Sequence, residues 1–243
     1  MSNYRWLLMD ADNTLFDFNA AQEFSLTRML IHFGVEPTAP VKDSFKTINA
    51  ALWNDYDRGE IAQADLPPER FRRFFAAQGI DGDVDAWCAF YREALAGCST
   101  LLPGAEQTCH RLADHYTLAL CTNGTSYIQR HRLEASPLAR YFGDRIFISE
   151  EMGCHKPDKL FFETVVEQLG ARTRRYQCLV IGDSLSSDIR GAFNARLDSV
   201  WIRPHGAKAG ALKPTYETSN LADLVRLLGA DRLLPLSYDD LFR

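Results

Sequence analysis

The sequence lacks the features that mark several classes of protein. Near its amino terminus the only apolar run is Trp6 to Met9, which ends at Asp10 and is too short for a signal peptide or a membrane span. We therefore expect a cytoplasmic protein without a membrane partner. Positive charge is not in excess either, because 27 basic residues face 32 acidic ones, a net charge of −5. Such a charge repels nucleic acid, so we expect no nucleic-acid partner.

Cysteine and histidine patterns are also missing. The six cysteines form no Cys-x-x-Cys pair, and the six histidines form no His-x-x-x-His pair. Structural disulfides and a zinc site are therefore not expected. Any metal bound by this chain is expected to have oxygen ligands.

What is present is ordinary for a folded globular protein. Hydrophobic residues make up 46% and charged residues 24% of the 243 residues, which excludes a disordered chain or a coiled coil. At roughly 150 residues per domain, this length suggests one large domain or a core with an insertion.

Five short apolar runs rich in strand formers predict an α/β fold. Helical patterns separate the last four runs, and strands that alternate with amphipathic helices are typical of a doubly wound parallel sheet. The predicted strands are Trp6–Met9, Leu118–Thr122, Ile146–Ser149, Cys178–Gly182 and Ser199–Ile202.

The first strand is separated from the second by far more chain than one crossover helix needs. This interval predicts an inserted helical cap domain at residues 18–98, with residues 1–17 and 99–243 forming the catalytic core. The insertion has helical patterns broken by proline and glycine. They cover Ala21–Phe33, Val41–Tyr56, Glu69–Gln78 and Asp83–Ala96, and another helix is expected at Ala105–His115.

Carboxylates follow several of the predicted strands. Ligands of open parallel sheets bind beyond the carboxyl ends of the strands, where this chain places Asp10, Asp12 and Asp183. In an extended segment, residues two apart point the same way, so Asp10 and Asp12 are expected to share one space and to repel each other. A third carboxylate at the same edge favours Mg²⁺, which prefers oxygen ligands. A carboxylate nucleophile beside Mg²⁺ is suited to attack on a phosphoryl group.

The phosphoryl oxygens need further donors. Thr122 ends the second predicted strand and Asn123 follows it; both precede a helix start, where backbone N–H groups bind anions. Lys156 adds a positive charge, and Pro157 is expected to begin the next helix and to direct the lysine toward the site.

These motifs, in this order, resemble the haloacid dehalogenase (HAD) superfamily across nearly the whole chain. The residues that carry the resemblance are Asp10-x-Asp12-x-Thr14, Thr122-Asn123, Lys156-Pro157 and Gly182-Asp183-x-x-x-x-Asp188. It implies a Rossmann-like core and a phosphatase in which Asp10 is phosphorylated and Asp12 acts as acid and then as base. It also implies that Asp10, the Asp12 carbonyl, Asp183 and Asp188 hold Mg²⁺, while Lys156 and Thr122 orient the phosphoryl group.

One position departs from the family pattern. Arg196 stands at the end of the helix after the fourth motif, where relatives usually have glycine. Glycine readily adopts the left-handed conformation that ends a helix, so the end of this helix is in question, although the chemistry is not.

The cap is expected to select the leaving group. The segment from Ala51 to Ile61, with Phe16 and Phe18, resembles bacterial house-cleaning pyrimidine 5′-nucleotidases, which implies a small-molecule phosphomonoester such as dUMP, dTMP or UMP. Phe16, Trp53 and Tyr56 are candidate contacts to the pyrimidine, with Asn54 or Asp55 at its polar edge. The helical spacing of Leu52, Trp53 and Tyr56 fits a cap core at least as well.

Other functions stay open at this stage. A sugar phosphatase of the N-acylneuraminate 9-phosphatase kind carries the same motifs, and a non-catalytic module that binds Mg²⁺ or phosphate is an alternative of another class. Dehalogenases lack a carboxylate at Asp12, and phosphonate cleavage needs a cap lysine, for which only Lys42 and Lys46 are candidates. Arg70, Arg72 and Arg73 are interpreted as a solvated helix face. The oligomeric state is not determined by the sequence.

Overall fold

A single parallel sheet forms the centre of the molecule. The computed structural model describes residues 4–208 and 210–230 and contains six parallel strands in the order β3-β2-β1-β4-β5-β6. They are β1 (Trp6–Met9), β2 (Thr117–Thr122), β3 (Ile146–Ile148), β4 (Cys178–Gly182), β5 (Asp198–Ile202) and β6 (Tyr216–Thr218). The expected α/β class is confirmed. Strand β6 escaped sequence prediction because it has three residues, of which only Thr218 is buried.

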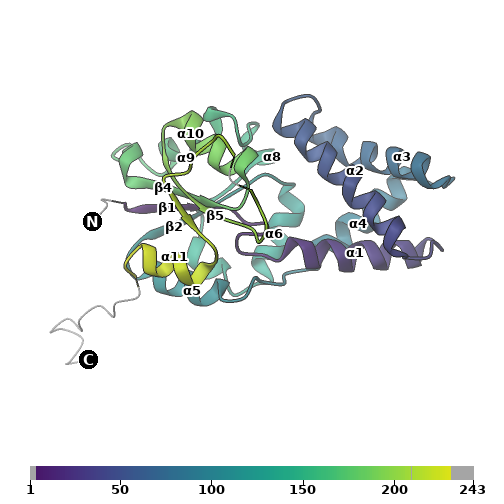
Figure 1. Ribbon diagram of the computed structural model, residues 1–243, viewed down its shortest axis with the longest axis horizontal. Coiled ribbons are helices and arrows are strands. Elements are labelled where there is room, and N and C mark those ends of the chain that lie inside the picture. Colours follow the sequence, from purple (N-terminus) through teal and green to yellow (C-terminus); the bar gives the residue numbers. More distant parts are fainter. Residues whose placement is uncertain (1–3, 209, 231–243) are drawn as a thin grey trace.

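Helices cover both faces of the sheet (Figure 1). On one face lie α5 (Ala105–Ala113), α7 (Ala139–Phe142) and α11 (Leu221–Leu227), and on the other α9 (Lys159–Gln168) and α10 (Arg190–Ala195). Side chains of β1 alternate accordingly: Leu7 and Met9 pack with the first group and Leu8 with the second. Burial on both faces explains why the strands are continuous apolar runs.

Four helices inserted after β1 form the cap, to one side of the sheet in Figure 1. They are α1 (Phe18–His32), α2 (Ala39–Asp57), α3 (Leu66–Gln78) and α4 (Val84–Ala96). Aromatic side chains that include Phe45, Phe71, Phe74 and Trp87 fill the space between them. The helix α1 begins three residues earlier than expected, because the Asp17 carboxylate accepts a hydrogen bond from the Ala20 N–H and caps it.

The two links between core and cap run side by side. Phe16 forms bridges to Asp12 and to Leu101, and the Asp17 N–H donates to the Thr100 carbonyl. The cap reaches the carboxyl ends of β1, β2 and β4, because cap residues and the residues at these strand ends line one cavity.

The remaining elements are short; most of them follow the carboxyl ends of strands, whereas η2 directly precedes β4. They are α6 (Ser126–Glu134), α8 (Ser149–Met152), the 3₁₀ turns η1 (Gln63–Asp65) and η2 (Arg175–Gln177), and the π-helical turn η3 (Leu185–Ile189). The prediction that Pro157 begins a helix is wrong: α9 begins at Lys159, because the Asp158 carboxylate accepts from the Leu160 N–H as its cap. No helix among residues 4–208 and 210–230 is long and apolar enough to cross a membrane.

Candidate active site

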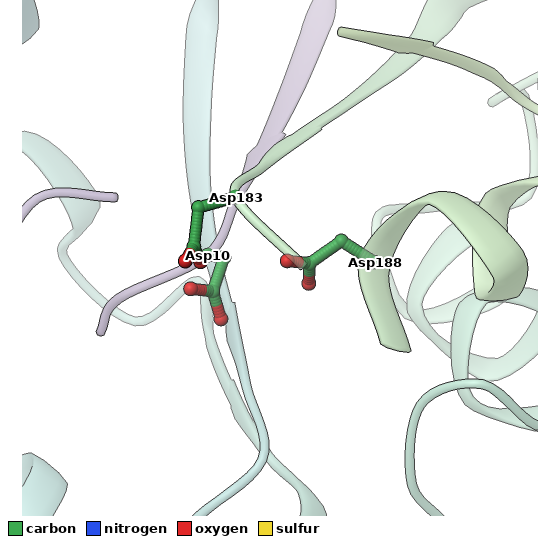
Figure 2. A group of neighbouring side chains, drawn as sticks. All are labelled: Asp10, Asp183 and Asp188. Atoms are coloured by element: carbon green, nitrogen blue, oxygen red, sulfur yellow. The ribbon is translucent and has the colours of Figure 1, made fainter. Parts of the chain in front are cut away.

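Three carboxylates meet at the carboxyl edge of the sheet. Met9 of β1 is in register with Ile181 of β4, so Asp10 and Asp183 leave the sheet beside each other, while Asp188 reaches the same point from η3. One oxygen of each lies within 4.8 Å of the others. Figure 2 shows the three side chains directed toward one another.

Lys156 lies buried against this group. Its Nζ donates to Oδ1 of Asp10 and Oδ1 of Asp188, both at 2.6 Å, and to the Cys121 carbonyl at 2.9 Å. The Asn123 side chain holds the lysine backbone from both sides, since its Nδ2 donates to the Lys156 carbonyl and its Oδ1 accepts from the Lys156 N–H. Asn123 therefore positions the lysine, a role that the sequence expectation of a phosphate donor did not include.

The electrostatics of the group are unbalanced. Burial, together with repulsion by Asp188, raises the pKa of Asp10 to about 7 against the attraction of Lys156. Burial and repulsion by Asp10 raise the pKa of Asp183 to about 8. For Lys156, burial acts to lower the pKa, but the two carboxylates outweigh it and the net shift is upward. One lysine thus faces three acids in a site of low dielectric.

This donor set fits a divalent cation. The three carboxylate oxygens converge on one point and carry more negative charge than Lys156 balances. A bound Mg²⁺ would neutralise this surplus. Asp10, Asp183 and Asp188 would hold it, whereas the carboxylate of Asp12 does not belong to the group.

Asp12 has its own cation, which sequence analysis missed. Its Oδ1 accepts from Nη1 of Arg132, whose side chain has no exposed surface, and its Oδ2 accepts from Nε2 of Gln129 at 2.8 Å. Arg132 also donates to the Cys98 carbonyl, where the chain leaves the cap, and lies 4.7 Å from the Phe16 ring centroid. The signal was helical spacing: Gln129, Arg132 and the apolar Leu133 share the buried face of α6.

A cavity of about 800 Å³ connects this site to the cap. Asp10, Asp12, Thr122, Lys156 and Asp183 are among its lining residues. The Thr122 hydroxyl is buried without a hydrogen-bond partner among the described residues, so it is free to donate to a bound oxyanion. Thr14, deeply buried, donates to Asp183 at a long 3.5 Å.

The structure separates the cap candidates. Trp53, Phe18 and Asn54 line the cavity, but Phe16 and Tyr56 do not. Phe16 belongs to the core of the sheet domain, and Tyr56 stacks on His155 with ring centroids 4.0 Å apart. Direct contact of these two with a base is thus not supported by the geometry.

The basic residues of the cap fulfil the expectations only in part. Lys42 and Lys46 pair with Glu23 and do not line the cavity, which leaves no cap lysine for phosphonate chemistry among the residues described. Arg72 and Arg73 are solvated, as the interpretation of that helix face required. For Arg70 the interpretation is wrong, because this side chain is buried and lines the cavity.

Comparison with known proteins places these features in context. A family model described as haloacid dehalogenase-like hydrolase matches residues 4–196. The pyrimidine 5′-nucleotidase PynA of Streptococcus pneumoniae is 36% identical, over 97% of this chain and 99% of that one. The pyrimidine 5′-nucleotidase YjjG of Escherichia coli is 34% identical, over 92% and 97%. The magnesium-bound crystal structure of the HAD-hydrolase YfnB of Bacillus subtilis superimposes with a TM-score of 0.87, at 34% identity and with 93% and 98% coverage.

Proposed function

Because the chain belongs to the haloacid dehalogenase-like hydrolases, we propose that it is a Mg²⁺-dependent pyrimidine 5′-nucleotidase with Asp10 as nucleophile. One observation carries the proposal. The Asp10 carboxylate accepts a hydrogen bond from Lys156 and lies beside Asp183 and Asp188. The same cavity is lined by a second carboxylate, Asp12, which other side chains hold in place.

Each residue has a task in this proposal. A bound Mg²⁺ supplies charge neutralisation for the phosphoryl group and for the acids that hold it. Asp10 attacks phosphorus and becomes an aspartyl phosphate, while Lys156 and the unpartnered Thr122 hydroxyl bind phosphoryl oxygens. Asp12 gives a proton to the alcohol as its bond to phosphorus breaks. Asp12 then takes a proton from a water molecule that attacks the phosphorus of the aspartyl phosphate, which releases phosphate and restores Asp10. Arg132 and Gln129 fix the position of Asp12.

The substrate class rests on the relatives and the cavity together. Two relatives aligned over more than nine-tenths of this chain are named pyrimidine 5′-nucleotidases. A cavity of about 800 Å³ has room for a nucleoside, and Trp53 and Phe18 in its wall offer aromatic faces to a base. A pyrimidine nucleotide is therefore favoured over a sugar phosphate as the substrate.

Turnover is favoured over mere binding. A module that only bound phosphate or Mg²⁺ would need neither an acid held apart from the cation site nor a cap that encloses the leaving group.

The test is phosphate release from UMP, dTMP and N-acylneuraminate 9-phosphate, with Mg²⁺ and with EDTA. We expect many turnovers on UMP and dTMP with Mg²⁺ only, and a loss of about 10²–10⁴ in kcat for Asp12→Asn, the range for general acid-base catalysis. Asp114→Asn, an exposed aspartate at the end of α5, is the matched control and should keep full activity. A preference for the sugar phosphate, or an unimpaired Asp12→Asn, would refute the proposal.

A further inference from the structure

Three cap helices each contribute one buried polar side chain to the wall of the cavity. These are Asn49 of α2, Arg70 of α3 and Tyr91 of α4, which are 6%, 7% and 3% exposed. Most other buried side chains of the cap are aromatic or aliphatic, and the buried polar Gln22 and Ser25 of α1 do not line the cavity. The mechanism proposed above uses none of the three.

Arg70 is a buried cation without an anionic partner. It forms no hydrogen bond or ion pair with any residue in the described part of the chain, and its Nε is fully enclosed. The titratable groups that influence it are the Tyr91 phenol and the Cys88 thiol. Burial raises the pKa of these two groups to about 12 and about 11, so both are neutral at pH 7 and neither balances the charge.

Aromatic rings compensate Arg70 only in part. The guanidinium carbon lies 5.6 Å from the ring centroid of Tyr91 and 6.0 Å from that of Phe45, at the outer limit of a cation–π contact. Burial of a charge without an anionic partner costs free energy, which such contacts return only in part. Of the guanidinium nitrogens only Nε is fully enclosed without a partner, and the side chain lines the cavity. A ligand in the cavity would supply the acceptors that Arg70 lacks.

The neighbouring side chains define what that ligand offers. Asn49 lies one helical turn from Phe45 and one turn from Trp53 on α2, so the amide and the indole face the same space. Asn49 supplies one acceptor and two donors, Tyr91 a hydroxyl, and Arg70 donors only. The hydroxyl of Tyr91 makes no hydrogen bond of 3.5 Å or less among the described residues, although the Gln22 side chain lies beside it.

We propose that Arg70, Asn49 and Tyr91 form a cap subsite that binds the carbonyl edge of a pyrimidine base stacked near Trp53. Ring carbonyl oxygens accept from Arg70, and the Asn49 amide pairs with a ring nitrogen or the second exocyclic group. This inference rests on the proposed nucleotidase function and names the residues that give it base specificity.

The test compares a substrate with and without its base. The ratio of kcat/KM for UMP to kcat/KM for ribose 5-phosphate is measured for the Mg²⁺-loaded wild type, Arg70→Met and Arg70→Lys, with Arg72→Met as control because Arg72 is exposed on the same helix. We expect the ratio to fall about 10–100-fold in Arg70→Met, as for loss of a hydrogen bond to a charged group. Arg70→Lys should recover only part of it, and Arg72→Met should match the wild type.

Thermal unfolding supplies a second readout. Because Arg70→Met removes a buried charge without an anionic partner, this variant should be at least as stable as the Arg72→Met control. If Arg70 served only to stabilise the cap, its replacement would lower the melting temperature. An unchanged ratio in Arg70→Met, or a clear drop in its melting temperature, would overturn the subsite while the nucleotidase function stands. A wild type that does not prefer UMP over ribose 5-phosphate would overturn the nucleotidase function itself. If a carboxylated sugar phosphate is then the better substrate and depends on Arg70, the guanidinium binds a carboxylate, and the base assignment is refuted.

Discussion

At Gly182, the last residue of β4, the absence of a side chain leaves room for the carboxylate of Asp188. A Cβ at this position would lie 2.2 Å from Oδ2 and 2.3 Å from Cγ of Asp188. Asp188 has no freedom to move away, because its Oδ1 accepts from Lys156 and its Oδ2 from the Ser184 N–H. The glycine of the fourth motif is therefore required for the close approach of η3 to the sheet.

Gly182→Ala should displace Asp188 and weaken the cation site. We expect Mg²⁺ affinity and kcat/KM to fall at least about tenfold, the effect typical of residues that orient metal ligands. Calorimetric Mg²⁺ titration and steady-state kinetics measure this. Gly97→Ala is the control, because its Cβ would have only an ordinary contact of 3.6 Å to the Glu93 carbonyl; equal affinity in both variants would contradict the argument.

At the scale of the element, the helix α10 ends without the glycine that the family resemblance implies at this position. Arg196 takes its place and adopts φ 58° and ψ 45°, so the chain turns out of the helix in the left-handed conformation despite the side chain. Three contacts hold this turn: the Arg196 N–H donates to the Phe193 carbonyl, the Leu197 N–H donates to the Ala192 carbonyl, and Leu197 belongs to the buried cluster formed with α9 and α10. Tertiary packing thus overrides the local conformational preference.

Arg196→Gly should stabilise the protein, because glycine adopts positive φ without the steric cost that an L side chain has there. We expect the free energy of unfolding to rise by ~0.5–1 kcal/mol in urea denaturation. The same change at Arg190, an exposed residue with helical φ of −64°, should instead lower it by ~1 kcal/mol. Equal effects at the two positions would show that the backbone conformation of Arg196 is not the cause.

For the whole molecule, the carboxylate group couples stability to pH and to metal. The pKa values of Asp10 and Asp183 are raised from 3.8 to about 7 and about 8 by burial and mutual repulsion. The folded protein therefore binds more protons than the unfolded chain between about pH 4 and 8, so these acids favour folding at low pH and oppose it increasingly as the pH rises through their folded pKa values. Lys156, whose pKa is shifted upward, stays charged throughout this window.

Mg²⁺ should therefore stabilise the protein more at pH 8.5 than at pH 6, since it binds the ionised acids and competes with their protons. At a Mg²⁺ concentration 100-fold above Kd, a rise in melting temperature of about 5–10 °C is expected at pH 8.5. Asp183→Asn should melt higher than the wild type without metal at that pH and respond less to Mg²⁺. A Mg²⁺ response independent of pH would contradict the coupling.

The sequence by itself determined the sheet, the insertion and the residues at the carboxyl edge. Apolar runs fix strands that are buried on both faces, and in a parallel sheet the residues after each run must meet at one edge, which brings Asp10 to Asp183 without knowledge of any contact. Short strands and the first residues of helices were harder to predict from the sequence. Strand β6 has too little apolar character, and the starts of α1 and α9 are set by hydrogen bonds to the side chains of Asp17 and Asp158.

Only the tertiary structure decided what surrounds the site. The contact of Arg132 with Asp12 and the place of Arg70 in the cavity wall depend on helices whose periodicity shows which side is buried but not what that side faces. The loop residue Asn123, which holds the lysine backbone, has no periodicity to indicate its partner. A buried helix face meets a core, a partner carboxylate or a cavity according to how the cap packs over the sheet. That packing joins residues distant in the chain, and no local pattern encodes it.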